Sequence, residues 1–154
     1  MGFLKSGDVI SGREGTAFIT IDGRNVPMFF LKNFEATIEL QKGEVPVLGK
    51  RMNQQKVTGA TGTGSMTIYK VTSEFAKIAI DYLKKGTVPS INIKITNDDP
   101  ASSIGRQSTL VKNILLDSIV IAKLDIESET LDEDVDFTFD DADLLEQFKT
   151  PTLG

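Results

Sequence analysis

The chain is 154 residues long, which suits one domain, and at this size folding buries roughly two-thirds of the surface that the unfolded chain exposes. It contains no cysteine and no histidine, which excludes disulfide bonds, thiolate metal sites, cysteine nucleophiles and the most common general base. The net charge is -5, and the fractions of 40% hydrophobic and 25% charged residues are those of an ordinary globular protein, so residues 1–154 are treated as a single domain.

The charge is distributed unevenly along the chain. Residues 122–154 hold 11 acids against Lys123 and Lys149, a net charge of -9, whereas residues 1–121 hold 11 acids against 15 bases, a net charge of +4. This polarity argues against stable nucleic-acid binding by the C-terminal portion and suits head-to-tail contact between copies. The N-terminus lacks the pattern of a signal peptide, and no apolar run approaches the roughly 20 residues that span a bilayer, so we expect a cytoplasmic protein without a membrane anchor.

Period-two alternation of apolar and polar residues dominates the sequence and predicts a mainly antiparallel β fold, a sandwich or barrel. The first predicted strand covers residues 17–21, and the Asp22-Gly23 pair after it is a hairpin signal that leads into residues 26–30. Pro27 places this second segment at a sheet edge or a bulge, because proline has no N–H to donate.

The clearest alternation lies in residues 34–41. Its apolar side chains share one face of the predicted strand and its polar side chains share the other, so one face of this strand should be solvated. The apolar face holds Phe34, Ala36, Ile38 and Leu40, and the polar face holds Glu35, Thr37, Glu39 and Gln41.

Residues 42–64 are predicted to form a long loop, because they mix proline and several glycines with basic and amide side chains. Their glycine-rich end does not match a phosphate-binding loop, since Ser65 stands where the Walker pattern needs lysine. A loop of more than about 15 residues is usually functional or disordered, so two interpretations stay open: an extension that packs on a neighbouring subunit, or a mobile surface loop. The candidate interface residues are Val47, Leu48, Lys50, Arg51, Met52 and Lys56.

A single amphipathic helix is predicted at residues 73–85, where the spacing of apolar residues changes to i, i+3, i+4, i+7. Thr72 or Ser73 can cap its start and Gly86 can end it. This helix should cover one open side of the sheets. Three more strands are predicted after it, at residues 91–96, 120–127 and 134–140, with a solvated turn at residues 97–105.

No catalytic, cofactor-binding or metal site is predicted. The acidic clusters lack the spacing of a calcium loop, and strand alternation explains several of them as solvent-facing rows. A β domain with several apolar strands and few edge-blocking prolines leaves unpaired backbone that pairs with other chains, and closure into a ring would satisfy it.

Short segments along nearly the whole chain, in the same order, resemble the tail tube proteins of contractile phage-like particles, the XkdM-like family of PBSX-type prophages. They include Ile10-Ser11-Gly12-Arg13-Glu14-Gly15, Gly49-Lys50-Arg51-Met52, Thr58-Gly59-Ala60-Thr61-Gly62-Thr63-Gly64, Tyr69-Lys70-Val71-Thr72-Ser73, Asp81-Tyr82-Leu83-Lys84-Lys85-Gly86 and Ile121-Ala122-Lys123-Leu124-Asp125.

The resemblance implies a tail-tube fold of the Hcp-like kind, with one flanking helix, that assembles into six-membered rings stacked as the inner tube of a contractile tail. The expected partners are further copies of the chain, the tail sheath protein, and the tape measure, baseplate and tail terminator proteins. The particle could be a phage, a defective prophage or a tail-like bacteriocin. On this interpretation Glu35, Thr37 and Glu39 are lumen-facing candidates, and the 42–64 segment bridges to a neighbour or the next ring.

Two other functions stay open. A secreted Hcp-like tube protein of a type VI-like secretion system would share the fold. A non-assembling β-sandwich that binds carbohydrate usually displays aromatic platforms, whereas this chain has no tryptophan and only Tyr69 and Tyr82. An enzyme built on carboxylates is the least favoured.

Overall fold

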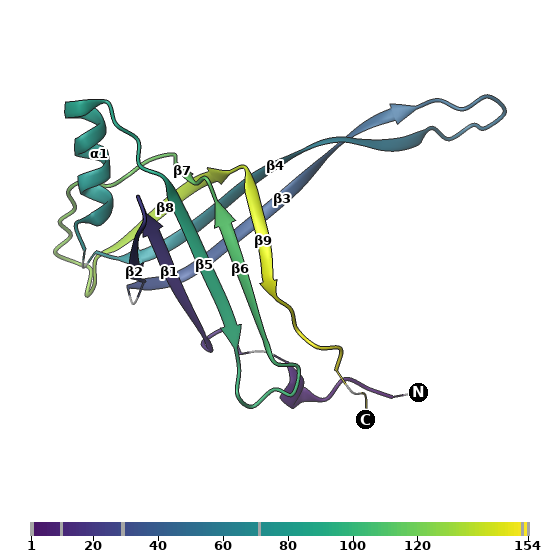
Figure 1. The fold of residues 1–154 in the computed structure, drawn as a ribbon, viewed down its shortest axis with the longest axis horizontal. Coiled ribbons are helices and arrows are strands. Elements are labelled where there is room, and N and C mark those ends of the chain that lie inside the picture. Colours follow the sequence, from purple (N-terminus) through teal and green to yellow (C-terminus); the bar gives the residue numbers. More distant parts are fainter. Residues whose placement is uncertain (1, 10, 29, 71, 152, 154) are drawn as a thin grey trace.

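The computed structural model describes residues 2–9, 11–28, 30–70, 72–151 and 153; Ile10, Phe29 and Val71, which fall in segments singled out above, lie outside them. Within the described residues the chain forms two antiparallel sheets and one α-helix (Figure 1), which confirms the predicted fold class. The elements are a short 3-10 helix (Ser6–Asp8), β1 (Gly15–Ile21), β2 (Arg24–Pro27), β3 (Leu31–Val45), β4 (Gln54–Tyr69), α1 (Glu74–Lys85), β5 (Ile91–Asp98), β6 (Arg106–Lys112), β7 (Leu115–Leu116), β8 (Asp132–Phe139) and β9 (Asp141–Glu146).

The two sheets pack face to face over one core. The five-stranded sheet has the order β2-β1-β5-β6-β9, and the four-stranded sheet has the order β3-β4-β8-β7. Each sheet contributes the alternate side chains of its central strands, and burial of each large apolar side chain stabilises the fold by roughly 1.5–3 kcal/mol. The fully or nearly fully buried ones include Ile19, Met66, Ile68, Ile91, Ile93, Val111, Ile114, Val135 and Phe137.

The predicted hairpin at Asp22-Gly23 is confirmed. Asp22 has φ 49° and Gly23 has φ 83°, the left-handed pair that joins β1 to β2 with the twist of the strands. Pro27 pairs with Phe18 and lies in β2, the edge strand of its sheet. An edge position tolerates proline because one side of the strand needs no donor.

The prediction of a long loop at residues 42–64 is wrong. Residues 31–45 and 54–69 form one long hairpin, β3 and β4, and only residues 46–53 connect the two strands. The glycines that suggested a loop lie inside β4, where Gly62 pairs with Phe139 and Gly64 with Phe137 on β8. A Cβ at Gly62 would lie 2.7 Å from the Phe139 ring, so these positions are small because an aromatic ring lies over them.

The predicted helix is confirmed as α1. Its buried residue Phe75 makes an edge-to-face contact with Phe30, with 6.4 Å between ring centroids. Thr72 caps the start by accepting a hydrogen bond from the Glu74 N–H at 3.3 Å, whereas Ser73 makes no such bond. Gly86 ends the helix with φ 70°, and its N–H donates to the Tyr82 carbonyl at 2.9 Å.

The predicted strand at residues 120–127 is also wrong. Residues 118–131 contain no strand, although their alternation is as regular as that of the real strands. The segment is held at its ends by side chains: Lys70 donates to the Val120 carbonyl at 2.6 Å, and Glu133 accepts the Val120 N–H at 3.0 Å. Lys70 and Glu133 form an ion pair of 3.3 Å, and Glu133 is only 3% exposed.

The turn expected at residues 97–105 joins β5 to β6 but is not fully solvated. Asp99 is buried and accepts the N–H groups of Ser11 and Ala101, each at 3.0 Å. Asp8 is buried as well and accepts the Ser103 N–H at 3.0 Å and the Ser103 hydroxyl at 2.5 Å. The bonds from Ser11 and Ser103 fasten the N-terminal segment to this turn, and the two from Ser103 hold the pKa of Asp8 below its usual value.

Candidate assembly surfaces

The outer half of the β3–β4 hairpin lies beyond the sandwich. The pairing of β8 with β4 ends at Phe139 and Gly62, so residues 39–61, called the arm below, form a ribbon of two strands without a third. Figure 1 shows this ribbon projecting far from the two sheets. A two-stranded ribbon is only marginally stable by itself in water, so we expect contacts from outside this chain to order it.

The arm ends in a tight turn that displays apolar side chains. The Lys50 N–H donates to the Val47 carbonyl at 3.2 Å, and Gly49 adopts φ 82° inside the turn. Leu48 at the apex is fully exposed, and Met52 is 77% exposed. The six interface residues predicted from sequence are all brought together on the arm, and all are exposed: Val47, Leu48, Lys50, Arg51, Met52 and Lys56.

The outer part of β3 also exposes residues that the sequence placed on a buried face. Ile38 is 56% exposed and Leu40 is 54% exposed, whereas Phe34 on the same face packs against the core. The reason is that the opposite sheet does not extend beyond this point, so the apolar face of β3 continues past the core into solvent. An exposed apolar row of this length is typical of an interaction surface.

The outer face of the four-stranded sheet is lined with acids and hydroxyls. Glu35, Thr37 and Glu39 are exposed on β3, with the polar residues of β4 and β8 beside them in register. The neighbours on this face, which the sequence did not single out, are Thr61, Thr63, Ser65, Asp136 and Thr138. The alternation of residues 134–140 predicts a polar face on that strand. Only the sheet order β3-β4-β8 shows that this face continues the polar face of β3.

Both edges of the four-stranded sheet have unpaired backbone. Among the described residues, the 15-residue strand β3 is an edge strand with a partner on one side only, β4. At the other edge, β7 pairs with two residues of β8, Thr138 and Phe137. Long, unblocked edges readily pair with strands of other chains.

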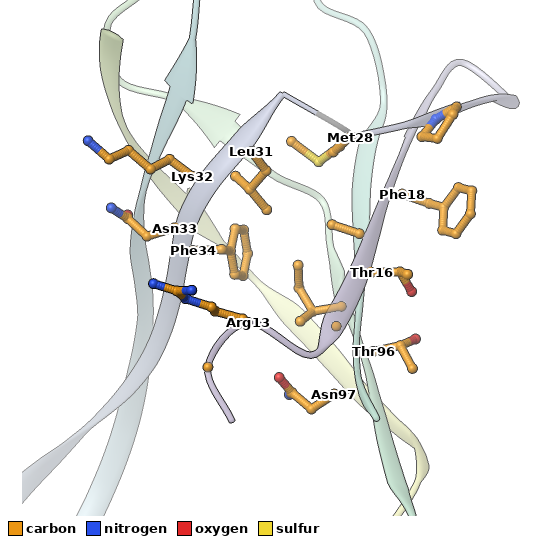
Figure 2. Close-up of a pocket in the computed structure, with 15 residues that line it drawn as sticks. Arg13, Thr16, Phe18, Met28, Leu31, Lys32, Asn33, Phe34, Thr96 and Asn97 are labelled. Carbon is orange, nitrogen blue, oxygen red and sulfur yellow. The ribbon is translucent and has the colours of Figure 1, made fainter. Parts of the chain in front are cut away.

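A cleft of about 590 Å³ opens where β1 and β3 face each other across the two sheets. Figure 2 shows Phe34 and Leu31 between the strands, with Arg13 and Lys32 reaching outward. The lining residues that the structure describes include no carboxylate, and the Lys32 amine pairs with Asp132 at 3.2 Å. The lining offers apolar contact and hydrogen-bond donors, without a pair of groups suited to acid–base chemistry.

Two groups of acids in the C-terminal portion differ in whether a cation pairs with them. Those on β9 are paired: Arg106 holds the pKa of Glu146 below its usual value by donating a hydrogen bond at 2.6 Å, and Asp143 raises the pKa of Lys112. Asp125, Glu127 and Glu129 have no cation partner among the residues that the structure describes.

No group of three or more acidic side chains in the described ranges is arranged to hold a metal ion. No described helix is long and apolar enough to cross a membrane.

Known proteins are similar to this chain in both sequence and fold. Residues 2–146 match the family model described as phage tail tube protein. The phage-like element PBSX protein XkdM of Bacillus subtilis (strain 168) is 44% identical over 144 residues, which cover 94% of this chain and 95% of XkdM.

Two solved particles contain chains with the same fold. A chain of the anti-feeding prophage baseplate, described as 6-fold symmetrised, superposes with a TM-score of 0.64 at 11% identity, covering 89% of this chain and 95% of that one. A chain of the PVC extracellular contractile injection system, solved as an extended sheath–tube complex, gives a TM-score of 0.64 at 12% identity, covering 88% of this chain and 90% of that one. The match over nearly the whole chain, together with the identity to XkdM, shows that the protein belongs to the phage tail tube protein family.

Proposed function

We propose that this chain is the subunit of the inner tube of a contractile phage tail or tail-like particle, and that its copies form six-membered rings stacked into a hollow tube. The observation that carries the proposal is the free outer edge of β3, in a chain of the tail tube family. A 15-residue edge strand leaves many N–H and C=O groups facing outward, and each hydrogen bond made there contributes about 0.5–1.5 kcal/mol.

In the ring, β3 of one copy pairs with the β7–β8 edge of the next. The contact is heterologous, since two different edges meet, and such a contact gives a closed ring when its rotation closes. Six copies are supported by the 6-fold description of the anti-feeding prophage particle that holds a chain of this fold. Pairing of this kind joins the four-stranded sheets into one continuous wall.

The outer face of that sheet then lines the lumen. Glu35, Thr37 and Glu39 would lie on the inner wall beside the hydroxyls of β4 and Asp136 of β8. An anionic wall repels the phosphates of DNA and does not bind them, which allows a strand of DNA to pass without sticking.

The arm bridges to a neighbouring copy or to the next ring. Its exposed apolar residues supply most of the binding energy, because an exposed ion pair contributes only about 0–1 kcal/mol. Around the tube lies the sheath protein, whose contraction drives the tube through the target envelope, and the baseplate and terminator proteins close its ends. The solved sheath–tube complex and baseplate that contain chains of this fold support these partners.

Electron microscopy of the purified chain at high concentration tests the proposal, because it predicts rings or cylinders. A concentrated chain that stays monomeric under all conditions would overturn it and favour the binding-module alternative. Cryo-microscopy of a tube should find Glu35, Thr37 and Glu39 on the inner wall, and their location on the outside would refute the lumen assignment.

Truncation of the arm separates folding from assembly. Glu39 and Thr61 pair in register, so residues 40–60 can be replaced by an Asn-Gly turn that closes the shortened hairpin. We expect the variant to fold, with a circular dichroism spectrum still typical of a β protein and a cooperative urea transition, and to form no tubes. Tube formation at the level of the full chain would show that the arm plays no part in assembly.

A further inference from the structure

The segment between β7 and β8 exposes apolar and acidic side chains that do not pack against the core of the sandwich. Residues 121–130, called the acidic loop below, are all exposed, and Leu124 and Ile126 are 97% and 99% exposed. The loop carries three acids, Asp125, Glu127 and Glu129, against one base, Lys123. Two large aliphatic side chains held almost entirely in water are costly, so a partner that covers them is favoured.

The acidic loop is anchored at its two ends and does not hang freely. Lys70 and Glu133 bind the backbone of Val120 just before it, and the Lys70 N–H donates to the Leu131 carbonyl at 2.8 Å just after it. Within the loop, Asp125 accepts the Glu127 N–H at 3.0 Å, which sets a turn over Asp125 to Glu127. The structure therefore presents these side chains at a defined place on the body.

The end of the arm, residues 42–56, called the arm tip below, carries the charge opposite to that of the acidic loop. Residues 42–56 carry four bases against one acid, and they display Leu48 and Met52 at the apex. Both surfaces combine exposed aliphatic side chains with charge, and the charges have opposite sign. Complementary charge fixes orientation and speeds encounter, while the apolar side chains supply the binding energy.

The two surfaces cannot meet within one molecule. Figure 1 shows the arm tip at one end of the longest axis, and the loop between β7 and β8 at the other end, beside α1. A contact between opposite ends of identical molecules is head-to-tail, and it repeats from copy to copy.

We propose that the arm tip of one copy docks on the acidic loop of a neighbouring copy, with Leu48 and Met52 against Leu124 and Ile126, and with Lys50 and Arg51 near Asp125 and Glu127. The inference rests on the proposed tube and names the surface that receives the arm. Each single contact is weak, and its repetition around a ring multiplies its effect on assembly.

Site-specific cross-linking tests the contact directly, because the natural chain has no cysteine. A tagged Leu48→Cys chain is mixed with an untagged Leu124→Cys chain and treated with a short bismaleimide, and the product is a heterodimer of distinct mass. The matched control replaces Leu124→Cys by Phe3→Cys, at a residue that is 73% exposed. Figure 1 shows the N-terminal segment on the opposite side of the sheets from the loop between β7 and β8. We expect heterodimer from the first pair and only background from the control.

This readout is independent of the tube. Cross-linking without tubes would support the docking contact while removing the proposed function. Tubes without cross-linking above the control would overturn the docking contact, leave the proposed function intact, and show that another partner covers the acidic loop.

Charge reversal gives a second test, which does not depend on the distance between two introduced cysteines. We expect Lys50→Glu with Arg51→Glu to abolish tubes, and Asp125→Lys with Glu127→Lys to do the same, while the combination of all four restores them. The control combines the reversed arm with Glu14→Lys and Asp98→Lys, which gives the same net charge at exposed residues elsewhere and should not restore assembly. Failure of the specific rescue, or equal rescue by the control, would contradict the docking contact.

Discussion

Gly64 on β4 has too little space around it for any larger side chain, and this gives a specific prediction about stability. A Cβ added at Gly64 would lie 2.6 Å from the carbonyl oxygen of Glu35 on β3, and it would overlap the ring of Phe137 on β8. Ordinary contacts between such atoms are about 3.5–4.0 Å. Neither neighbour moves easily, because one is paired backbone and the other is 1% exposed and stacked on Phe34 with 5.4 Å between ring centroids.

We therefore expect Gly64→Ala to destabilise the fold. Overpacking of a well-packed interior costs roughly 1–3 kcal/mol, and the lower backbone entropy of alanine in the unfolded chain returns about 0.5–1 kcal/mol. The midpoints of these two ranges leave a net loss of about 1 kcal/mol. At this chain length each kcal/mol lowers Tm by about 2–4 °C.

Urea unfolding of dilute protein, followed by circular dichroism, measures the free energy of unfolding. Gly12→Ala is the matched control, since a Cβ there has nothing within 4 Å, and it should show only the entropic gain, a stabilisation of about 0.5–1 kcal/mol. In a Phe137→Leu background the cost of Gly64→Ala should be smaller, because part of the overlap is relieved. Equal stability of the Gly64 and Gly12 variants would refute the packing argument.

Two other perturbations have defined outcomes. Lys70→Met leaves the buried Glu133 carboxylate without its cation, and it should lower the free energy of unfolding in urea by about 3 kcal/mol. The control Lys32→Met breaks an exposed ion pair and should cost about 0–1 kcal/mol. Equal costs for the two variants would contradict the role of burial. Asp8 has a folded pKa below its unfolded value, so its stabilisation is present at neutral pH and is lost as pH falls through the folded pKa. Asp8→Asn should therefore be less stable than the natural chain at pH 7 and show a smaller loss on acidification, and parallel pH profiles would exclude the link to Ser103.

Local signals were sufficient for several elements. The spacing of Phe75 and Ile78 with the glycine at residue 86 predicts α1, because a helix is stabilised by contacts between residues three and four apart. The Asp22-Gly23 turn is predicted for the same reason, since its backbone geometry depends on the two residues themselves.

Similar alternation led to opposite outcomes in two places. Residues 134–140 and 120–127 alternate equally well, yet the first became β8 and the second forms no strand. Alternation shows which side chains are apolar and which are polar. A β-strand forms only where its backbone also pairs with another strand, and alternation contains no information about that partner. β8 lies between β4 and β7, and the segment before it pairs with no strand among the residues that the structure describes.

The sequence by itself determined that the protein is a β domain with one helix, unlike charges at its two ends, and a candidate contact region around Val47 to Lys56. Only the tertiary structure decided that this region is a projecting hairpin, because the glycines of β4 are explained by Phe137 and Phe139, which lie more than 70 positions away in the chain. Pairing between distant strands also decided which edges stay open, and an open edge is a property of the whole sheet that no local pattern of residues contains.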